Sequence, residues 1–84
     1  MSDTDRIEEL VSYLVTSLVD TPDAVSIKRV DQGADVLLEV TVDPDDVGKV
    51  VGKQGRIIKA IRTLARAAGT GSGEDSFVHV EVMG

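Results

Sequence analysis

The first part of the chain carries apolar residues at the spacing of one face of a helix. Positions i, i+3, i+4, i+7 and i+11 of this stretch are apolar, and such spacing predicts an amphipathic helix over residues 3–19. Asp20-Thr21-Pro22 follows directly and ends the helix, because proline cannot continue it. The apolar stripe consists of Ile7, Leu10, Val11, Leu14 and Leu18.

Three later stretches have the composition or the alternation of strands. Residues 25–30 are short and β-branched, and residues 36–42 alternate apolar and other positions, so each predicts a strand. The segment Asp31–Asp35, which contains Gly33, lies between them and predicts a hairpin loop. Residues 77–82 alternate again, with Val78, Val80 and Val82 on one face and Phe77, His79 and Glu81 on the other.

Two helices are expected between the second and third strands. Asp43 as N-cap and Pro44 in the first turn start a short helix over 44–51, which ends at Gly52. A second helix over 55–68 ends in the glycine-rich segment 69–73. The periodicity places the following residues inward: Ile57, Ile58, Ile61, Leu64, Ala65 and Ala68. It places Arg56, Lys59, Arg62 and Arg66 outward.

The element order is therefore α-β-β-α-α-β. The first two strands pair antiparallel through the hairpin, and the two-helix connection returns the chain parallel to the second strand. Each strand has one apolar face, so we expect a two-layer α/β (α+β) domain with three helices on one face of a three-stranded mixed sheet. A chain of 84 residues has room for one such domain, which would span residues 1–84.

Composition removes several classes of chemistry. The chain has no cysteine and one histidine, which excludes disulfides and the usual zinc sites. Its apolar runs are too short to span a membrane, and the acidic N-terminus does not resemble a signal peptide. No nucleophile and base stand out as a pair, so we expect no enzyme activity, no cofactor and no metal.

The net charge of −6 conceals a strong asymmetry. Residues 44–68 contain six cations and two acids, a net charge of +4, whereas the rest of the chain contains three cations and thirteen acids, a net charge of −10. No acidic residue occurs between Val47 and Gly73. A local anion site on an otherwise acidic chain would explain this segregation, and a solvated helix face is the alternative.

The turn Gly52-Lys53-Gln54-Gly55 favours the anion site. Its two glycines permit positive φ angles and expose backbone N–H groups, and Gly55 leads directly into the second helix. A helix N-terminus attracts anions, and Lys53 and Arg56 add full charges there. We therefore expect backbone N–H groups over residues 53–57, with Lys53, Arg56 and Lys49, to hold phosphates. An apolar floor beside the turn would come from Val47, Val51, Ile58 and Val40.

Residues 50–61, VVGKQGRIIKAI, look like the KH-domain signature V-I-G-x-x-G-x-x-I-x-x-I, with Val51 in place of the first isoleucine. The helix and strand before the core resemble the type II KH topology. The whole chain is similar to the small bacterial single-KH proteins of the KhpA (YlqC) family. The resemblance implies binding of about four nucleotides of single-stranded RNA beside the GxxG loop. The residues implied are Gly52, Lys53, Gln54, Gly55, Arg56, Lys49, Ile58, Lys59 and Val51.

The same resemblance implies a cytoplasmic protein that forms a homodimer or pairs with a KhpB (Jag or EloR)-like partner in post-transcriptional regulation. The small residues Ala60, Ala65, Ala67 and Ala68 would let a partner helix approach the second helix closely. An adaptor that uses the fold mainly for pairing is the main alternative, supported by the acidity outside the basic segment. A P-loop is disfavoured because Gln54 occupies the Ser/Thr position, and DNA is not distinguished from RNA.

Overall fold

The computed structural model describes residues 3–33, 35–69 and 78–84. The predicted order of helices and strands is confirmed, with ends within two residues of the expected ones except at the short helix expected over 44–51, which is a 3-10 turn over Pro44–Asp46 followed by an α-helix over Val47–Val51. Three short 3-10 turns, η1 to η3, were not predicted. The elements are α1 (Asp3–Leu18), η1 (Pro22–Ala24), β1 (Ser26–Gln32), β2 (Asp35–Thr41), η2 (Pro44–Asp46), α2 (Val47–Val51), η3 (Lys53–Gly55), α3 (Arg56–Gly69) and β3 (Val78–Met83).

The sheet has the order β1-β2-β3 and is mixed, as predicted. β1 and β2 pair antiparallel from Ser26 opposite Thr41 to Gln32 opposite Asp35, so the strands extend further into the expected loop than the sequence indicated. Gly33 supplies the positive φ of +69° that this tight connection needs. β2 and β3 pair parallel, and the connection between them is the two-helix crossover.

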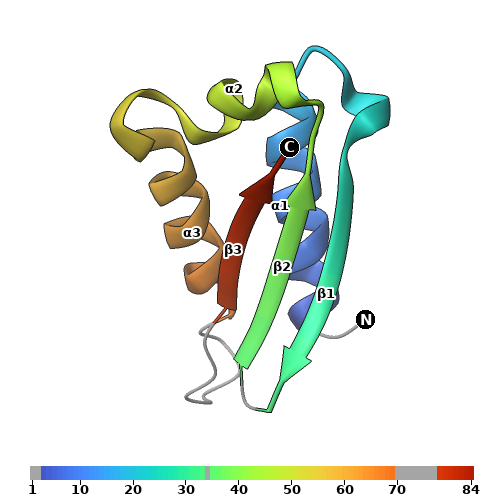
Figure 1. Cartoon of the computed structure of the whole chain (residues 1–84). Helices are drawn as coiled ribbons and strands as arrows, with labels where there is room; N and C mark the ends of the chain where they lie inside the picture. The colour runs from blue at the N-terminus through green and yellow to red at the C-terminus, as the bar shows by residue number, and fades with distance from the viewer. Residues whose placement is uncertain (1–2, 34, 70–77) are drawn as a thin grey trace.

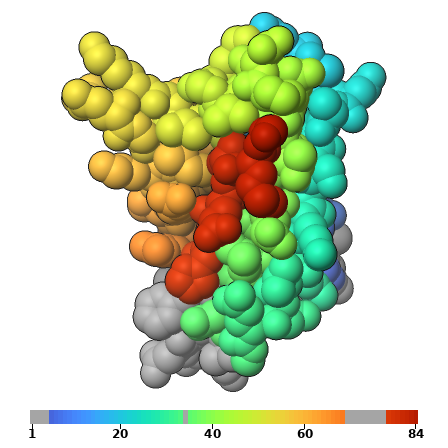
Figure 2. Space-filling view, viewed as in Figure 1, coloured from blue at the N-terminus to red at the C-terminus, as the bar shows by residue number. Residues whose placement is uncertain are grey.

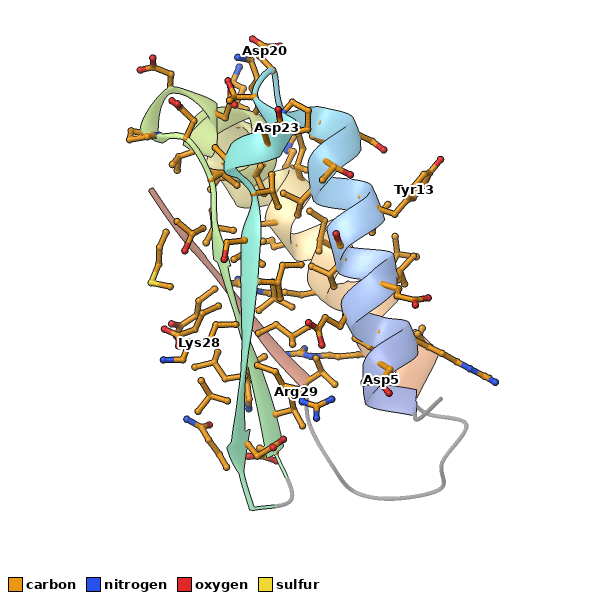
Figure 3. The ribbon with its side chains drawn as sticks, turned by 90° about the vertical axis from the view of Figure 1, so that its right-hand side faces the viewer. Asp5, Tyr13, Asp20, Asp23, Lys28 and Arg29 are labelled. Atoms are coloured by element: carbon orange, nitrogen blue, oxygen red, sulfur yellow. The ribbon has the colours of Figure 1, made fainter. Side chains whose placement is uncertain are left out.

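The helices lie on one side of the sheet. α1 and α3 cover one face, and the short α2 lies across the end of β2 and β3 (Figure 1). None of the described helices covers the other face, and Figure 3 shows Lys28 on that side, away from α1. In the part of the chain that the structure describes, no helix is both long and apolar enough to cross a bilayer.

The core lies between the sheet and the helices. From α1 it takes Ile7, Val11 and Val15, of which Val15 was missing from the predicted stripe because Leu14 and Leu18 suit the pattern equally well. Leu64 and Ala68, predicted to face inward, are exposed. The remaining core residues are Leu38, Val40, Val42, Val50, Ile58, Ile61, Ala65, Val78 and Val80.

Two sequence expectations fall on residues outside the described ranges. The glycine-rich segment after α3 is described only at Gly69, the last residue of that helix, and the rest of it is not described. Phe77, expected at the start of the last strand, is also outside the described residues, and β3 is described from Val78.

The acids at the start of the crossover have two different roles. Asp43 is the N-cap, as predicted, and its Oδ1 accepts the Asp45 N–H at 2.9 Å. Asp46 has a buried side chain, at 2% exposure. Its carboxylate accepts the backbone N–H of Thr21 at 3.0 Å and the Lys49 ammonium at 3.1 Å. Asp46 therefore ties the start of α2 to the connection between α1 and β1.

Lys49 strengthens this connection by bonding to both Asp46 and Asp20. Its Nζ also donates to Asp20 Oδ2 at 2.6 Å. Burial by itself would raise the pKa of Asp46, but the hydrogen bonds from Lys49 and from the Thr21 and Asp20 backbone outweigh it and lower the pKa below 3.8. The hydrogen bonds to Asp20 and Asp46 raise the pKa of Lys49 above 10.5.

The lowered pKa gives a prediction for acid stability. A carboxyl group whose pKa is depressed on folding stabilises the folded state above its unfolded pKa, near 3.8, and loses this contribution as the pH falls further. Asp46→Asn should therefore be less stable than wild type at pH 7, and the difference should shrink below pH 4. Urea unfolding at several pH values measures the difference in the free energy of unfolding between variant and wild type. Asp45→Asn, at the exposed neighbouring position, is the control. A difference from wild type that is independent of pH would contradict the assignment.

Candidate nucleic-acid interface

Gly52 begins the connection between α2 and α3. Its N–H closes α2 by donating to the Gly48 carbonyl at 2.8 Å, and its backbone then turns to φ 76° and ψ 175°. These angles lie in a region that is essentially restricted to glycine. A Cβ at this position would also stand 2.6 Å from Cγ1 of Ile57. Conformation and space therefore both require glycine here.

The next residues form one tight turn. Gln54 has φ 58° and ψ 24°, a left-handed conformation that is uncommon for a residue other than glycine, and Gly55 has φ 73°. The Gly55 N–H donates to the Gly52 carbonyl at 3.2 Å, and the Arg56 N–H donates to the Lys53 carbonyl. Two of the backbone donors expected to meet phosphates are thus used inside the turn.

The N–H groups of Lys53 and Gln54 stand at the start of the turn, where a helical segment offers its first donors no internal acceptor. Gln54 is left-handed and directly follows Lys53, and a left-handed residue in a turn can direct successive N–H groups toward one anion. A left-handed glutamine stores strain, which is typical of functional loops.

The cations around the turn are available to a ligand. The side chains of Lys53, Gln54, Arg56 and Lys59 are all exposed. Figure 2 shows this segment, in yellow, projecting from the upper left corner of the molecule. Because the turn projects and no acid lies between Val47 and Gly73, its positive potential is not cancelled by its neighbours in sequence. We refer to residues 52–56 with Lys59 as the basic turn.

The structure does not bring every predicted residue to the basic turn. Lys49 was predicted to help hold a phosphate. It lies on α2, where Asp20 and Asp46 compensate its charge, so it is not free to do so. Ile58, expected in the floor of the groove, is a core residue at 6% exposure because it shares the inward face of α3 with Ile61. Val40 is fully buried and is also wrong as a floor residue. Val47 and Val51 are half-buried and remain accessible beside the turn.

The cations further along α3 differ from one another. Arg66 is exposed, as expected for a solvated helix face. Arg62 is only partly exposed, and its Nε donates to the backbone carbonyl of Val80 in β3 at 3.1 Å. The helical periodicity of α3 could not reveal this contact, because it joins two elements 18 residues apart.

A separate cavity of about 590 Å³ lies between α1 and β1, away from the basic turn. Its lining includes Asp5, Glu8 and Glu9, so this cavity would repel a polyanion. Asp5 is itself bonded to Arg29 at 3.1 Å, and both are labelled in Figure 3. Within the described ranges no group of three or more acidic or histidine side chains could hold a metal ion.

The geometry of Gly52 gives a second prediction. Gly52→Ala should lower the free energy of unfolding by about 1–3 kcal/mol, because alanine is strained at these angles, and its Cβ must also displace Ile57. Gly48→Ala is the matched control, since a Cβ there meets nothing within 4 Å and alanine favours the helix by up to about 1 kcal/mol. Denaturant unfolding of both variants is the measurement. Equal stability of the two would show that the turn is not held as described.

Known proteins resemble this chain over most of its length. A family model described as the KH domain of KhpA and KhpB matches residues 8–82. A protein of Clostridium acetobutylicum called RNA-binding protein KhpA is 44% identical over 77 residues, which cover 92% of this chain and 100% of the relative. The protein of the same name from Bacillus subtilis is 46% identical over 70 residues, 82% of this chain and 86% of the relative.

Among solved structures, Aquifex aeolicus Era bound to GDP and AlF4⁻ superposes with a TM-score of 0.68 at 19% identity. Era in complex with MgGDPNP and nucleotides 1506–1542 of 16S ribosomal RNA superposes with a TM-score of 0.69 at 20% identity. Each match covers 90% of this chain but only 29% of the Era chain, so it shows a shared fold. The relatives are named as RNA-binding proteins and not as enzymes. The extent of the family match and the identity to these relatives show that the chain belongs to the KhpA/KhpB family of KH domains.

Proposed function

We propose that this protein binds single-stranded RNA, with the phosphates held at the basic turn. The observation that carries the proposal is the pair of N–H groups of Lys53 and Gln54 at a glycine-flanked, left-handed turn that opens α3. Exposed Lys53, Arg56 and Lys59 add full charges around them. The name of the relatives, RNA-binding protein, supports the same ligand.

Each residue of the site has a distinct proposed role. Lys53 and Gln54 offer their backbone N–H groups to a phosphate. Gly52 and Gly55 allow the RNA strand to approach the protein backbone closely. Arg56 and Lys59 extend the positive track along α3. Lys49 supports the site indirectly by fixing α2, and half-buried Val51 forms an apolar wall on which a base can rest.

The proposal predicts a sharp effect of charge at the turn. Replacing Lys53 and Gln54 together by aspartate should abolish RNA binding, because two carboxylates then face the phosphates, and should leave the fold intact because both side chains are exposed. Fluorescence anisotropy with short labelled RNA at low and at physiological salt measures the affinity.

The control variant makes the same change of charge elsewhere. Lys28 and Gln32 are exposed on β1, and replacing both by aspartate alters the net charge equally. This control should keep most of the affinity at physiological salt, where distant charges are screened. Unchanged RNA affinity in the Lys53/Gln54 variant, or no binding by wild type, would refute the site and favour the adaptor function.

We also propose that the protein works as a dimer in the cytoplasm, in post-transcriptional regulation. One phosphate-holding turn gives weak, salt-sensitive binding, and two linked sites raise the overall affinity without new contacts. An apolar groove of about 310 Å³ between α1 and α3 is suited to pairing. We call it the α1–α3 groove, and it is lined by Tyr13, Leu14, Ser17, Leu18, Ile57, Ala60, Ile61 and Leu64.

Exposed apolar side chains support this use of the α1–α3 groove. Tyr13 is 70% exposed and points away from the sheet (Figure 3), and Leu64 is 48% exposed. Ala60 is exposed and lines the same groove, whereas Ala65, predicted to line the interface, is fully buried. We propose a second copy of the chain as occupant. A KhpB-like protein could replace it, because one family model describes the KH domains of both.

The dimer is tested by one charge in the α1–α3 groove. Leu64→Glu should convert the dimer to a monomer, because a carboxylate would be buried without a partner. Light scattering after size exclusion measures the mass, and Thr63→Glu, on the neighbouring exposed position, is the control. A Leu64→Glu protein with the mass of wild type would contradict this surface, as would a monomeric wild type.

A further inference from the structure

The cavity between α1 and β1 combines acidic and apolar side chains. Its volume of about 590 Å³ lies within the range of roughly 300–1,000 Å³ that is usual for ligand sites. Its lining residues on α1 follow the spacing i, i+3, i+4 and i+7, so they share one face of the helix. The cavity is lined by Asp5, Glu8, Glu9, Ser12, Val25 and Ile27.

Such a lining suits a long cationic side chain. Lysine and arginine lay their methylene groups on apolar surface and keep the charge at polar groups, and half-buried Val25 and Ile27 offer that surface here. Arg29 of the same chain reaches from β1 to Asp5 at 3.1 Å (Figure 3). None of the described residues forms an ion pair with Glu8 or Glu9. Two carboxylates of the cavity therefore remain for an external cation.

The basic turn carries the complementary charges. Lys53, Arg56 and Lys59 are exposed, and within the described ranges no acid forms an ion pair with them. Arg56 and Lys59 stand three residues apart on α3, as Asp5 and Glu8 do on α1. Residues at this spacing have Cβ atoms about 5–6 Å apart on the helix surface. The two helices thus present opposite charges at matching intervals.

The basic turn of one chain lies far from the cavity of the same chain. The turn between α2 and α3 is at the upper left of Figure 1, whereas α1 begins near the N-terminus at the lower right. A contact between the two surfaces must therefore join two copies of the chain. Because the surfaces differ, such a contact is heterologous, and each added copy leaves a turn free at one end and a cavity free at the other.

The cavity is also distinct from the α1–α3 groove. The groove takes Tyr13, Leu14, Ser17 and Leu18 from α1, and no residue lines both sites. The two contacts can therefore form in one assembly, and they differ in physical character. The groove is apolar, whereas the cavity would bind through charge.

We propose that the α1–β1 cavity binds the basic turn of a second copy in a head-to-tail contact, and that RNA releases this contact. The contact between copies does not depend on RNA. Its release rests on the proposed function, because Lys53, Arg56 and Lys59 would then face either the phosphates or the cavity of the next copy. The cavity would act as an internal competitor for the RNA-binding site.

Sedimentation velocity without RNA, over a range of protein concentrations, tests the contact. The net charge of −6 makes copies repel one another more strongly at low salt, so general electrostatics opposes association there. The average mass should nevertheless rise with concentration at low salt and fall at physiological salt, because complementary surfaces attract each other when screening is weak. An apolar dimer through the α1–α3 groove would not show this salt dependence.

Two charge reversals identify the surfaces. Glu8→Lys/Glu9→Lys raises the net charge of −6 by four, to −2, and Lys53→Glu/Arg56→Glu lowers it by four, to −10. Each variant alone should raise the apparent Kd of self-association about tenfold. A mixture of the two should associate as wild type does, because the turn of each variant then complements the cavity of the other. Both variants remain acidic, so bulk attraction cannot explain such a rescue.

The control makes the same change of charge away from the cavity. Asp23 and Asp45 are exposed, and Asp23 lies at the opposite end of α1 from Asp5 (Figure 3). Asp23→Lys/Asp45→Lys should keep the self-association of wild type. Circular dichroism checks the fold of each variant, and Glu8→Gln/Glu9→Gln replaces the cavity reversal if that protein fails to fold.

The outcomes separate this inference from the proposed function. A wild-type mass that does not rise with concentration at low salt, or a mixture of the reversed variants that fails to associate, would overturn the contact and leave RNA binding in place. Short single-stranded RNA should return wild type to its mass at physiological salt. Bound RNA that leaves the low-salt mass unchanged would overturn the release. Self-association without any RNA binding would refute the proposed function and the release, and would leave the contact.

Discussion

The parallel pairing of β2 and β3 is the constraint on which the rest of the structure depends. Parallel neighbours cannot be joined by a tight hairpin, so the chain must cross from one end of the sheet to the other. The crossover is made by α2 and α3, and the sharp reversal between them falls at the end of the sheet (Figure 1). Glycines at 52 and 55 make that reversal sterically possible. The same geometry that returns the chain to β3 therefore exposes backbone donors at a projecting corner.

The cations of the crossover fall into two groups, those exposed near the corner and one held in ion pairs. Cations near the corner stay exposed, whereas Lys49, a few residues earlier, is held by Asp20 and Asp46 and stabilises the packing of α2. Asp46 connects α2 to the α1–β1 connection by accepting the Thr21 N–H. This ion-pair cluster thus holds α2 in place, and the neighbouring cations remain available for a ligand. The net acidity of the chain arises elsewhere, on surfaces such as the cavity between α1 and β1.

Local patterns in the sequence were sufficient for the elements, the sheet order and the glycine turn, because periodicity, capping and φ requirements act over a few residues. The errors concern contacts between distant residues. The burial of Asp46 depends on Thr21, and the position of Arg62 depends on β3. Ile58 and Leu64 both fit an apolar helix face, but Ile58 is buried and Leu64 is 48% exposed, because burial depends on how the neighbouring elements pack against α3. Such information is not contained in a single amphipathic pattern.

The hydrogen bond from Arg62 to Val80 has a consequence for the behaviour of the protein at high concentration. An unpaired strand edge is a template on which another chain can add a strand, and sheets with open edges are prone to aggregate. Arg62 occupies a carbonyl in the middle of β3, so the edge cannot offer an uninterrupted ladder. The opposite edge, β1, carries Lys28, Arg29 and Asp31, and Arg29 turns inward to Asp5. Both borders of this small sheet are thereby protected against growth into fibrils.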